Sequence, residues 1–364
     1  MSVPGSQFSS TTFFEFQESA QRGRENELST QPLKSSSIIE PVVARQFWSR
    51  DLVSSRDLSP TEVDTVFSLT ALIKARPAEF SRSLAGKQVA LFFEKPSLRT
   101  RLTFEAAMAS MGGAAFFVDQ REERLGTREA LSDVAHNVER WVNAMVLRTF
   151  SHATIENMAV HSSIPVINAL SNLEHPCQAL ADYFTLQERF GDLKKISLAY
   201  VGDGNNVAHS LMLTAATVGS RIRIATPKGY EPSAEIVRDT KAIAAETGAV
   251  IELLNDPHEA VDGVDAIYTD AWTSMGWEHE AEQRGRIFVP YQVNDALMAE
   301  AAPHALFMHC LPAHRGEEVT DSVIDSEASV VFDQAENRMH VQKAILLLLL
   351  GGEIGRQKVR SANA

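Results

Sequence analysis

The sequence predicts an α/β fold made of two doubly wound parallel-sheet domains, with a C-terminal helix that packs back on the first domain. Short apolar runs alternate with amphipathic segments along most of the chain, which is typical of parallel sheets with helices on both faces. The chain has 364 residues, enough for two domains that each bury a core. The strand–helix alternation begins a second time after Gly191-Asp192, so a second domain is expected there.

The first domain is expected to begin with a helix over residues 60–75. Ser59 can cap this helix, and Glu62 can complete a capping box. The apolar run 89–93 predicts a buried strand, and Ser97 is the expected N-cap of the helix that follows. Further strands are expected at 114–118, 144–148 and 165–168, with helices at 129–141 and 176–189.

The second domain continues the same alternation. Strands are expected at 196–201, 221–225, 250–254, 266–269, 305–309 and 330–332, with helices at 207–218 and 234–247. A last helix over 335–350 is long and apolar on one side, so we expect it to return to the first domain. The expected organisation is a disordered or loosely attached extension at 1–45, a first domain at 46–175, a second domain at 176–334 and the returning helix at 335–352.

Composition narrows the classes of protein to which the chain can belong. The formal net charge is −13 and the pI about 5.4, which argues against a nucleic-acid binder with a basic face. The most apolar run, 344–350, is far shorter than the ~20 residues of a membrane-spanning helix. Cys177 and Cys310 are the only cysteines, too few for a disulfide framework, so a cytoplasmic protein is expected. Residues 1–45 carry several acids, unlike a transit peptide.

The stretch 89–105 predicts a binding site for an anion. Arg99 and Arg101 follow Ser97 in the first turn of the expected helix. The N-terminal end of a helix is already positive, so arginines there are favourable when an anion is bound. Guanidinium forks, backbone N–H groups and a hydroxyl together suit a phosphate. We expect Arg99 to contact the anion and Arg101 to form an ion pair. The alternative is a capped helix whose arginines both pair with surface acids.

Four further polar residues stand at or just after the ends of expected strands, where ligands bind in open parallel sheets. Arg148 ends the strand 144–148, and Asn168 ends the next strand. His175 and Gln178 open a helix and carry groups that bond a carbonyl and an amide. Taken singly, His175 is more simply an ordinary N-cap residue, so the prediction depends on the set.

Three more candidates lie in the second half of the chain. Asp270 follows the strand 266–269 and can bind or deprotonate an ammonium group; the alternative is a capping aspartate. Cys310 follows the strand 305–309, and its thiolate is expected to form if cations are near. No base–nucleophile pair indicates a cysteine hydrolase. Arg338 opens the last helix and can reach the same cleft; the alternative is a solvated surface arginine.

The motifs predict neither a cofactor nor a metal. The turn Gly202-Asp203-Gly204 follows a strand, as a dinucleotide-binding turn does, but Val207 stands where the third glycine belongs. No group of cysteines and histidines has the spacing of metal ligands.

Taken together and in order, these motifs resemble the aspartate/ornithine carbamoyltransferase family over about residues 47–352. The matching parts are Ser97-Leu98-Arg99-Thr100-Arg101, Arg148, Asn168, His175-Pro176-Cys177-Gln178, Asp270 with Ser274-Met275-Gly276, His309-Cys310-Leu311-Pro312 and Arg338. The Ser-Met-Gly part resembles the ornithine-specific members. The resemblance implies an enzyme of arginine metabolism that transfers the carbamoyl group of carbamoyl phosphate to the side-chain amine of L-ornithine. The products would be L-citrulline and phosphate.

The resemblance also implies roles for individual residues. Those implied for carbamoyl phosphate are Ser97, Leu98, Arg99, Thr100, Arg124, Arg148, His175, Pro176, Cys177, Gln178, Cys310, Leu311 and Arg338. Those implied for ornithine are Asn168, Asp270, Ser274 and Met275, and Arg148, His175, Asp270 and Cys310 are the implied catalytic residues. A homotrimer or a trimer-based assembly is implied as well.

Two positions depart from the family pattern. Leu98 stands where a threonine is usual, which confines this position to a backbone contact. Arg124 stands where a glutamine usually reaches the phosphate of a neighbouring subunit, and its guanidinium can also bind phosphate.

Three other functions stay open. A carbamoyltransferase for a related amine, such as putrescine or an acylated ornithine, would keep most motifs, although Asn168 and Ser274-Met275 favour a free amino-acid head group. A binding or regulatory protein would keep the fold without turnover, and the intact arginines argue against it. A nicotinamide dehydrogenase is disfavoured by Val207.

Overall fold

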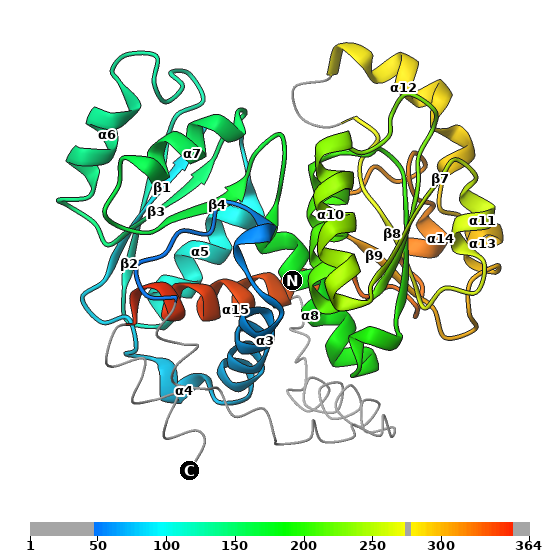
Figure 1. Ribbon diagram of the computed structural model, residues 1–364, viewed down its shortest axis with the longest axis horizontal. Helices are drawn as coiled ribbons and strands as arrows, with labels where there is room; N and C mark the ends of the chain where they lie inside the picture. The colour runs from blue at the N-terminus through cyan, green and yellow to red at the C-terminus, as the bar shows by residue number, and fades with distance from the viewer. Residues whose placement is uncertain (1–46, 274–277, 352–364) are drawn as a thin grey trace, which may run out of the picture. The chain divides into compact units, whose positions relative to one another are not determined.

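Two parallel β-sheets form the framework of the protein in a computed structural model that describes residues 47–273 and 278–351 (Figure 1). The first sheet has the strand order β2-β1-β3-β4, and the second has the order β7-β6-β5-β8-β9. The strands are β1 Gln88–Phe93, β2 Ala114–Asp119, β3 Ala144–Arg148, β4 Val166–Leu170, β5 Ser197–Val201, β6 Arg221–Ala225, β7 Val250–Leu254, β8 Ala266–Thr269 and β9 Leu306–His309. Every pairing between these strands is parallel, which confirms the predicted fold class.

Helices lie between the strands and cover the sheets (Figure 1). The α-helices are α3 Pro60–Ala75, α4 Pro77–Phe80, α5 Leu98–Ser110, α6 Leu131–Val138, α7 His152–Val160, α8 Pro176–Phe190, α9 Asn206–Val218, α10 Ala234–Thr247, α11 Pro257–Val261, α12 Ala281–Ile287, α13 Asp295–Met298, α14 Asp321–Ile324 and α15 Val331–Leu350. Short 3-10 helices are η1 Ser55–Asp57, η2 Leu193–Lys195, η3 Glu278–Glu280 and η4 Val289–Tyr291. None of the helices in this described part of the chain is long and apolar enough to cross a membrane.

Two predicted helix starts are confirmed in detail. The Ser59 side chain accepts a hydrogen bond from the backbone N–H of Glu62, and the Glu62 carboxylate accepts one from the backbone N–H of Ser59. At α5, the Ser97 side chain accepts from the backbone N–H of Thr100 at 3.2 Å. These bonds satisfy N–H groups that have no partner within the helix, so the local sequence decides where each helix begins.

The predicted strand at 330–332 is wrong. Ser329 forms only an isolated bridge with Phe307, and the backbone N–H of Val330 donates to the Phe307 carbonyl at 3.0 Å. The chain then turns into α15, whose first turn contains Asp333, an acid that favours a helix N-terminus. Three apolar residues were too short a run to separate a strand from a helix start. The prediction also missed α7.

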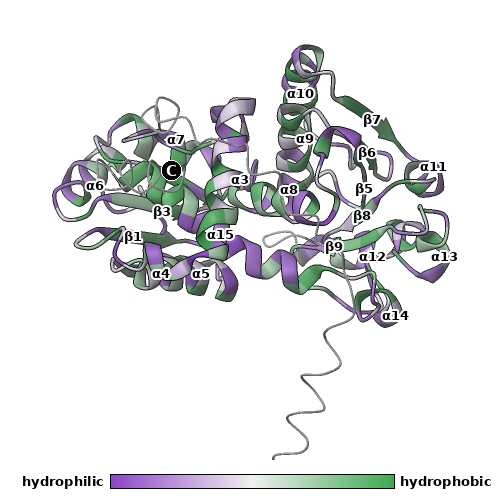
Figure 2. Cartoon of the chain, turned by 90° about the horizontal axis from the view of Figure 1, so that it is seen from below, coloured by the Kyte–Doolittle hydropathy of each residue, from purple (hydrophilic) through white to green (hydrophobic). Residues whose placement is uncertain are grey.

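Helix α15 packs against α3 and α5 of the first domain and against α8, as expected for a returning helix. Its second half is hydrophobic and its first half mostly hydrophilic (Figure 2). Residues 341–350 are all buried, in a core that includes residues from both sheets. The polar first half places Arg338 at the junction of the two domains, where it bonds Thr100 of α5.

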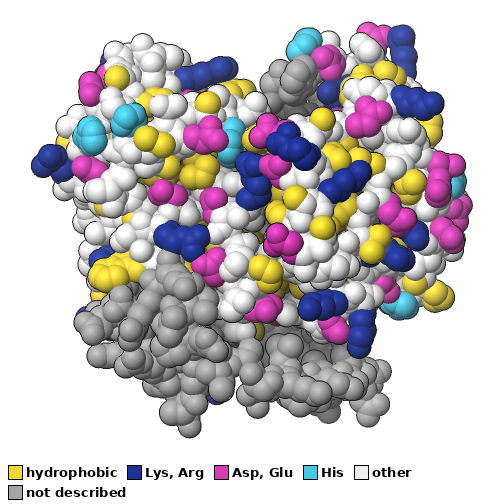
Figure 3. Space-filling view, viewed as in Figure 1, with side chains coloured by type: hydrophobic (Ala, Val, Ile, Leu, Met, Phe, Trp, Pro, Cys, Tyr) yellow, Lys and Arg dark blue, Asp and Glu magenta, His cyan; other side chains and the backbone are white. Residues whose placement is uncertain are grey.

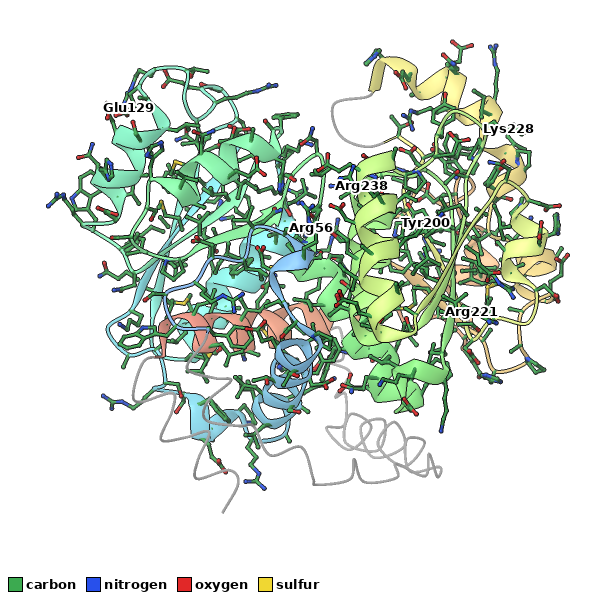
Figure 4. All side chains as sticks on the ribbon, in the orientation of Figure 1. Arg56, Glu129, Tyr200, Arg221, Lys228 and Arg238 are labelled. Atoms are coloured by element: carbon green, nitrogen blue, oxygen red, sulfur yellow. The ribbon has the colours of Figure 1, made fainter. Side chains whose placement is uncertain are left out.

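Other contacts also connect the domains. Arg56 of η1, labelled in Figure 4, forms an ion pair with Asp239 of α10.

Tyr200, also labelled there, lies in β5 and stacks with Tyr268 of β8 inside the second sheet. On the face shown in Figure 3, basic and acidic side chains are intermixed rather than segregated.

Candidate active site

A cavity of about 970 Å³ opens at the carboxyl ends of strands from both sheets. The predicted residues that line it are Ser97, Leu98, Arg99, Thr100, Arg148, His175, Gln178, Asp270, Cys310, Leu311 and Arg338. They come from the end of β3, from the starts of α5 and α8, from the segments after β1, β4, β8 and β9, and from α15. Tertiary structure therefore gathers residues that are up to 241 positions apart in sequence, from Ser97 to Arg338. Ligands of open parallel sheets bind at this edge.

Three arginines give the wall of the cavity a positive charge. Arg99 starts α5, Arg148 ends β3 and Arg338 lies on α15. Arg148 is 4% exposed, and burial together with the charge of Arg338 lowers its pKa to about 9. Among residues 47–273 and 278–351, none of the three forms an ion pair with an acid, and the Nε atoms of Arg148 and Arg338 have no hydrogen-bond partner. An anion would satisfy these donors.

The start of α5 adds to this positive charge. The Ser97 hydroxyl caps the helix, and the first-turn residues Leu98, Arg99 and Thr100 line the cavity. The Thr100 hydroxyl accepts a hydrogen bond from Nη2 of Arg338 at 2.7 Å, which joins α5 to α15. Backbone N–H groups at a helix N-terminus favour an anion, so this arrangement extends the site of the three arginines.

Arg101 does not line the cavity. Its Nε is 2.9 Å from Oε1 of Glu105, one turn later on α5, and its guanidinium stacks 3.9 Å from the centre of the Phe117 ring. Arg101 therefore forms an ion pair as expected, and Arg99 lines the cavity, while contact of Arg99 with an anion stays a prediction.

His175 and Gln178 lie at the start of α8 and face the arginines. Burial, with the charges of Arg338 and Arg148, holds the pKa of His175 well below its ordinary value, so the ring is neutral near pH 7. Its Nδ1 has no hydrogen-bond partner in the described residues. Gln178 donates from Nε2 to Oδ1 of Asp182 at 2.7 Å. A neutral imidazole and a carboxamide can each bond a polar ligand without adding charge.

Asp270 and Cys310 meet in the cavity wall formed after β8 and β9. The Cys310 thiol donates to Oδ1 of Asp270 at 3.1 Å, and Asn205 donates from Nδ2 to Oδ2 at 2.9 Å. Burial and the neighbouring Asp270 charge raise the pKa of Cys310 well above its ordinary value. The expected thiolate is therefore wrong: the sulfur is a neutral thiol that orients the carboxylate. Sequence reasoning missed Asn205, which also caps α9.

The two cysteines of the folded protein are expected to react slowly with alkylating reagents, because their thiols are not ionised. Cys310 is held as a thiol, and burial raises the pKa of Cys177 to about 12. Iodoacetamide at about pH 8 is expected to modify both cysteines of the folded protein at least tenfold more slowly than those of the unfolded chain. Peptide mass spectrometry over a time course measures this. Rapid modification of Cys310 in the folded protein would contradict the assignment of a neutral thiol.

Several predicted site residues do not line the cavity. Asn168 lies inside β4 rather than at its end, fully buried, and donates from Nδ2 to the Val53 carbonyl at 2.8 Å. Cys177 is buried behind it, with its sulfur 3.6 Å from the Asn168 carbonyl, and Pro176 is also outside the lining. Arg124 is exposed and stacks 4.0 Å from the centre of the Phe150 ring. For Asn168 the reason is that the end of the short strand β4 was expected two residues too early.

Two predicted residues, Ser274 and Met275, lie outside the described residues. The segments on either side of them converge on Arg284 of α12. Its guanidinium donates to Asp203 at 2.9 Å, to the Trp272 carbonyl at 3.0 Å and to Glu280 at 2.9 Å. Sequence reasoning missed this buried arginine, and an arginine in a short helix gives little signal of burial. It holds the wall that contains Trp272 in place.

Asn206 is a cavity residue that sequence reasoning missed. It begins α9 directly after Asn205 and donates from Nδ2 to the Ser171 carbonyl at 2.6 Å. The sequence feature that could have indicated Asn206 is the pair Asn205-Asn206, which follows the turn 202–204 at a strand end. That turn was considered only as a weak dinucleotide-binding motif. Close packing explains the glycine at position 204, because a Cβ there would lie 2.4 Å from the Pro232 nitrogen. The turn is therefore built for close packing.

The loop after β9 is held by a buried hydrogen bond between His309 and Glu318. His309 Nε2 lies 3.2 Å from Oε1 of Glu318, and both side chains are fully buried. His309 Nδ1 accepts from the backbone N–H of Leu311 at 2.8 Å, so Nε2 carries the proton. Leu311 has φ +58, which is unusual for a residue with a Cβ. The histidine therefore fixes the backbone beside Cys310.

Two groups of the described residues bring metal-ligand atoms within 4.8 Å of one another. The first is Asp270, His309 and Cys310, and the second is His314, Glu317 and Glu318. Both ring nitrogens of His309 already have partners, Glu318 and the Leu311 backbone. The first group therefore offers a carboxylate and a thiol to a cation, and the second a histidine and two carboxylates.

The fold and the cavity define a two-domain α/β protein that binds an anionic small molecule between residues of both domains. A family model described as the carbamoyl-P binding domain of aspartate/ornithine carbamoyltransferase matches residues 50–188. A second, the Asp/Orn binding domain of the same family, matches residues 194–349. The chain belongs to the aspartate/ornithine carbamoyltransferase family.

Individual relatives agree with the family models. The ornithine carbamoyltransferase of Pyrococcus abyssi is 50% identical over 305 residues, which are 83% of this chain and 96% of the relative. The structure of ornithine carbamoyltransferase from Pyrococcus furiosus superposes with a TM-score of 0.82 at 48% identity, covering 84% of this chain and 98% of that one. Ornithine transcarbamoylase from Giardia lamblia gives a TM-score of 0.76 at 35% identity, covering 82% and 98%.

Proposed function

We propose that the protein transfers the carbamoyl group of carbamoyl phosphate to the side-chain amine of L-ornithine, forming L-citrulline and phosphate. The observation that carries the proposal is that one cavity is lined both by unpaired arginines and by an acid. Arg99, Arg148 and Arg338 form no ion pair among the described residues, and Asp270 accepts a hydrogen bond from the Cys310 thiol. A doubly charged phosphate suits the arginines, and an ammonium group suits Asp270. The relatives named above carry the same activity in their names.

For carbamoyl phosphate, the proposed contacts follow the cavity lining. Ser97, the Leu98 backbone, Arg99, Thr100 and Arg148 hold the phosphate. His175, Arg148 and Thr100 bond the carbonyl oxygen, and Gln178, Arg338 and the backbone of Cys310 and Leu311 orient the NH₂ group. All of these residues line the cavity, which supports the assignment. Pro176 and Cys177 act indirectly, by fixing the start of α8.

For ornithine, Asp270 holds the side-chain amine and Asn206 replaces Asn168 as the amide that bonds the amino-acid head group. Asn206 lines the cavity and Asn168 does not, which supports the exchange. Ser274 and Met275 remain predicted ornithine contacts outside the described residues.

The chemistry needs donors more than it needs a nucleophilic side chain. The uncharged amine of ornithine bonds to the carbonyl carbon, negative charge develops on the carbonyl oxygen, and the C–O bond to phosphate breaks. The phosphate leaves with the electron pair, and the amine loses its proton. Donors aimed at a developing oxyanion each supply about 3 kcal/mol. Arg148 and the neutral His175 are placed for this role, and Asp270 is placed to receive the amine.

A citrulline assay tests the proposal directly. Carbamoyl phosphate is supplied with L-ornithine, putrescine, N-acetylornithine or aspartate, and citrulline, the other carbamoyl products and phosphate are measured. We expect turnover with ornithine at least a hundredfold above the other amines. Turnover only with another amine would mean that this amine, and not ornithine, is the acceptor. Ligand-induced stabilisation without phosphate release would indicate a binding protein. Stabilisation by a nicotinamide nucleotide would favour a dehydrogenase.

The Arg99→Ala variant separates the binding of the two ligands. We expect its affinity for carbamoyl phosphate to fall by about tenfold or more, because a charge-assisted hydrogen bond is lost, while ornithine affinity changes little. The matched control is Arg101→Ala on the same helix turn, since Arg101 pairs with Glu105 outside the cavity. Calorimetry measures both affinities. Equal losses for both ligands in Arg99→Ala would contradict the anion site.

We further propose the domain division 46–175 for carbamoyl phosphate and 176–334 for ornithine, joined by the returning helix 335–352; the extension 1–45 lies outside the described residues. A homotrimer or trimer-based assembly is proposed too. Exposed apolar side chains support it: Leu98 and Leu102 stand one turn apart on α5, which packs against the edge strand β2 carrying exposed Phe116. Arg124, outside the cavity of its own chain, would then reach a neighbour's phosphate. Light scattering of wild type and Leu102→Lys tests the assembly.

A cytoplasmic location is also proposed. Both cysteines of the sequence are free, which suits a reducing compartment. Cell fractionation with detection of the protein tests this, and recovery in an oxidising compartment would contradict it.

A further inference from the structure

Asp182 is a buried acid that the proposed reaction does not use. It lies on α8, one turn after Gln178, is fully buried, and does not line the cavity. Its Oδ1 accepts hydrogen bonds from Nε2 of Gln178 and from Nε2 of Gln334, both at 2.7 Å. Its Oδ2 accepts from the Tyr268 hydroxyl at 3.1 Å. A buried carboxyl group with this many bonds fixes its neighbours as well as itself.

The direction of each bond follows from one fixed donor, the backbone N–H of His309. This N–H can only donate, and it donates to Oε1 of Gln334 at 3.0 Å. The other carboxamide atom of Gln334 must then be the NH₂ group, so Oδ1 of Asp182 must accept. Gln178, which shares that oxygen, must also turn its NH₂ group toward Asp182. Its Oε1 is the carboxamide atom that remains, and it has no hydrogen-bond partner among the described residues.

We propose that Asp182 is a positioning residue that makes the site select a carbamoyl donor over an acetyl donor, by fixing the Gln178 carboxamide with its oxygen free for the ligand. An oxygen at that place accepts a hydrogen bond from an NH₂ group but gains nothing from a methyl group of the same size. A buried acceptor left unpaired disfavours the methyl analogue. The proposal rests on the proposed function, since it assigns the selectivity of the same donor site.

The arrangement above applies to the ionised carboxyl group of Asp182, whose two oxygens can only accept. Burial raises the pKa of Asp182 to about 7. The groups that face it are Gln178 on its own helix, Tyr268 from β8, and Gln334 and Arg338 from α15; the Cys310 charge state is also sensitive to it. Protonation would make the carboxyl group a donor and release the Gln178 carboxamide. The selectivity is therefore expected at pH values above about 7 and is expected to weaken below it.

Carbamoyl phosphate and acetyl phosphate are the probes, because they differ only in NH₂ against CH₃. Calorimetry with the full chain measures both affinities for wild type, Asp182→Leu and Asp182→Asn. In Asp182→Leu the affinity for carbamoyl phosphate is expected to fall about tenfold or more, while that for acetyl phosphate changes less than about twofold. Asp182→Asn is the matched control: its amide oxygen can replace Oδ1 and its NH₂ can face Tyr268, so it should keep the wild-type ratio.

Two outcomes overturn the proposal: an unchanged ratio of the two affinities in Asp182→Leu, with or without an equal loss of both, or loss of the ratio in Asp182→Asn. An equal loss would show a role in general stability. If Asp182→Leu does not give a cooperative melting transition, Asp182→Ser replaces it, because a hydroxyl both donates and accepts and so releases the Gln178 carboxamide. A wild-type protein that binds neither carbamoyl phosphate nor acetyl phosphate would contradict the proposed function itself. If wild type prefers carbamoyl phosphate and Asp182→Leu prefers it to the same degree, only this inference is contradicted.

Discussion

Replacement of Arg148 by methionine is expected to lower kcat/KM for carbamoyl phosphate by roughly a thousandfold. The Arg148 guanidinium ends β3 inside the cavity, is 4% exposed and pairs with no acid among residues 47–273 and 278–351. Its charge is held beside those of Arg338 and Arg99, which together with burial lowers its pKa to about 9. A phosphate with its adjoining carbonyl oxygen is the natural partner of such a group. Methionine keeps an unbranched apolar stem and loses every donor.

The same variant should be at least as stable as wild type in the absence of ligand. A buried charge without a partner destabilises the folded state, so its removal relieves repulsion with Arg338 and Arg99. Thermal melting with and without phosphate provides the check, together with steady-state kinetics. Phosphate is expected to raise the melting temperature of wild type and to have little effect on the variant. A strongly destabilised variant, or one with an undiminished phosphate shift, would show that Arg148 has a structural role.

Replacement of Asp270 by asparagine is expected to lower kcat/KM for ornithine by about a hundredfold while leaving the affinity for carbamoyl phosphate within about twofold. Both Asp270 oxygens accept from the protein: Oδ1 from the Cys310 thiol and the Ala271 N–H, and Oδ2 from Asn205. An asparagine NH₂ group would face a donor on either side. The variant therefore loses the charge that attracts the amine and also the fixed orientation of the group.

Asp262→Asn is the matched control for this second variant. Asp262 is exposed and precedes β8, whereas Asp270 follows it, so the control removes one acid charge away from the cavity. Initial rates at varied ornithine and calorimetry with carbamoyl phosphate separate the two ligands. Equal activity of both variants, or loss of carbamoyl phosphate binding in Asp270→Asn, would contradict the assignment of Asp270 to ornithine alone.

Features that depend on nearby residues could be predicted from the sequence. The helix starts at Ser59 and Ser97 and the strand after Lys87 follow from caps and apolar runs, which act over three or four residues. The separate environments of Arg99 and Arg101 also followed, because residues two apart on a helix face different sides. Where the pattern was short, as at 330–332, the prediction was wrong.

The candidate site was only partly predictable, because it depends on residues that are far apart in the sequence. Arg148 and Asp270 were found because strand ends are visible in the sequence. Asn168 was expected at a strand end facing the ligand, but it lies inside β4, and Asn206 was overlooked. A local sequence pattern does not show which amide side chain reaches the cavity. The charge state of Cys310 also depended on distant groups, since Asp270 is 40 residues away.

The sequence by itself determined the two parallel-sheet domains, the returning helix and the set of residue types that suit a phosphate and an amine. These follow from periodicity, caps and side-chain chemistry. The tertiary structure alone decided which of those residues share one cavity, that three arginines lie together without an ion pair among the described residues, and that Asp182 sets the direction of the Gln178 carboxamide. Burial and hydrogen-bond direction arise from residues far apart in the chain, such as His309, Gln334 and Asp182, and no local pattern contains them.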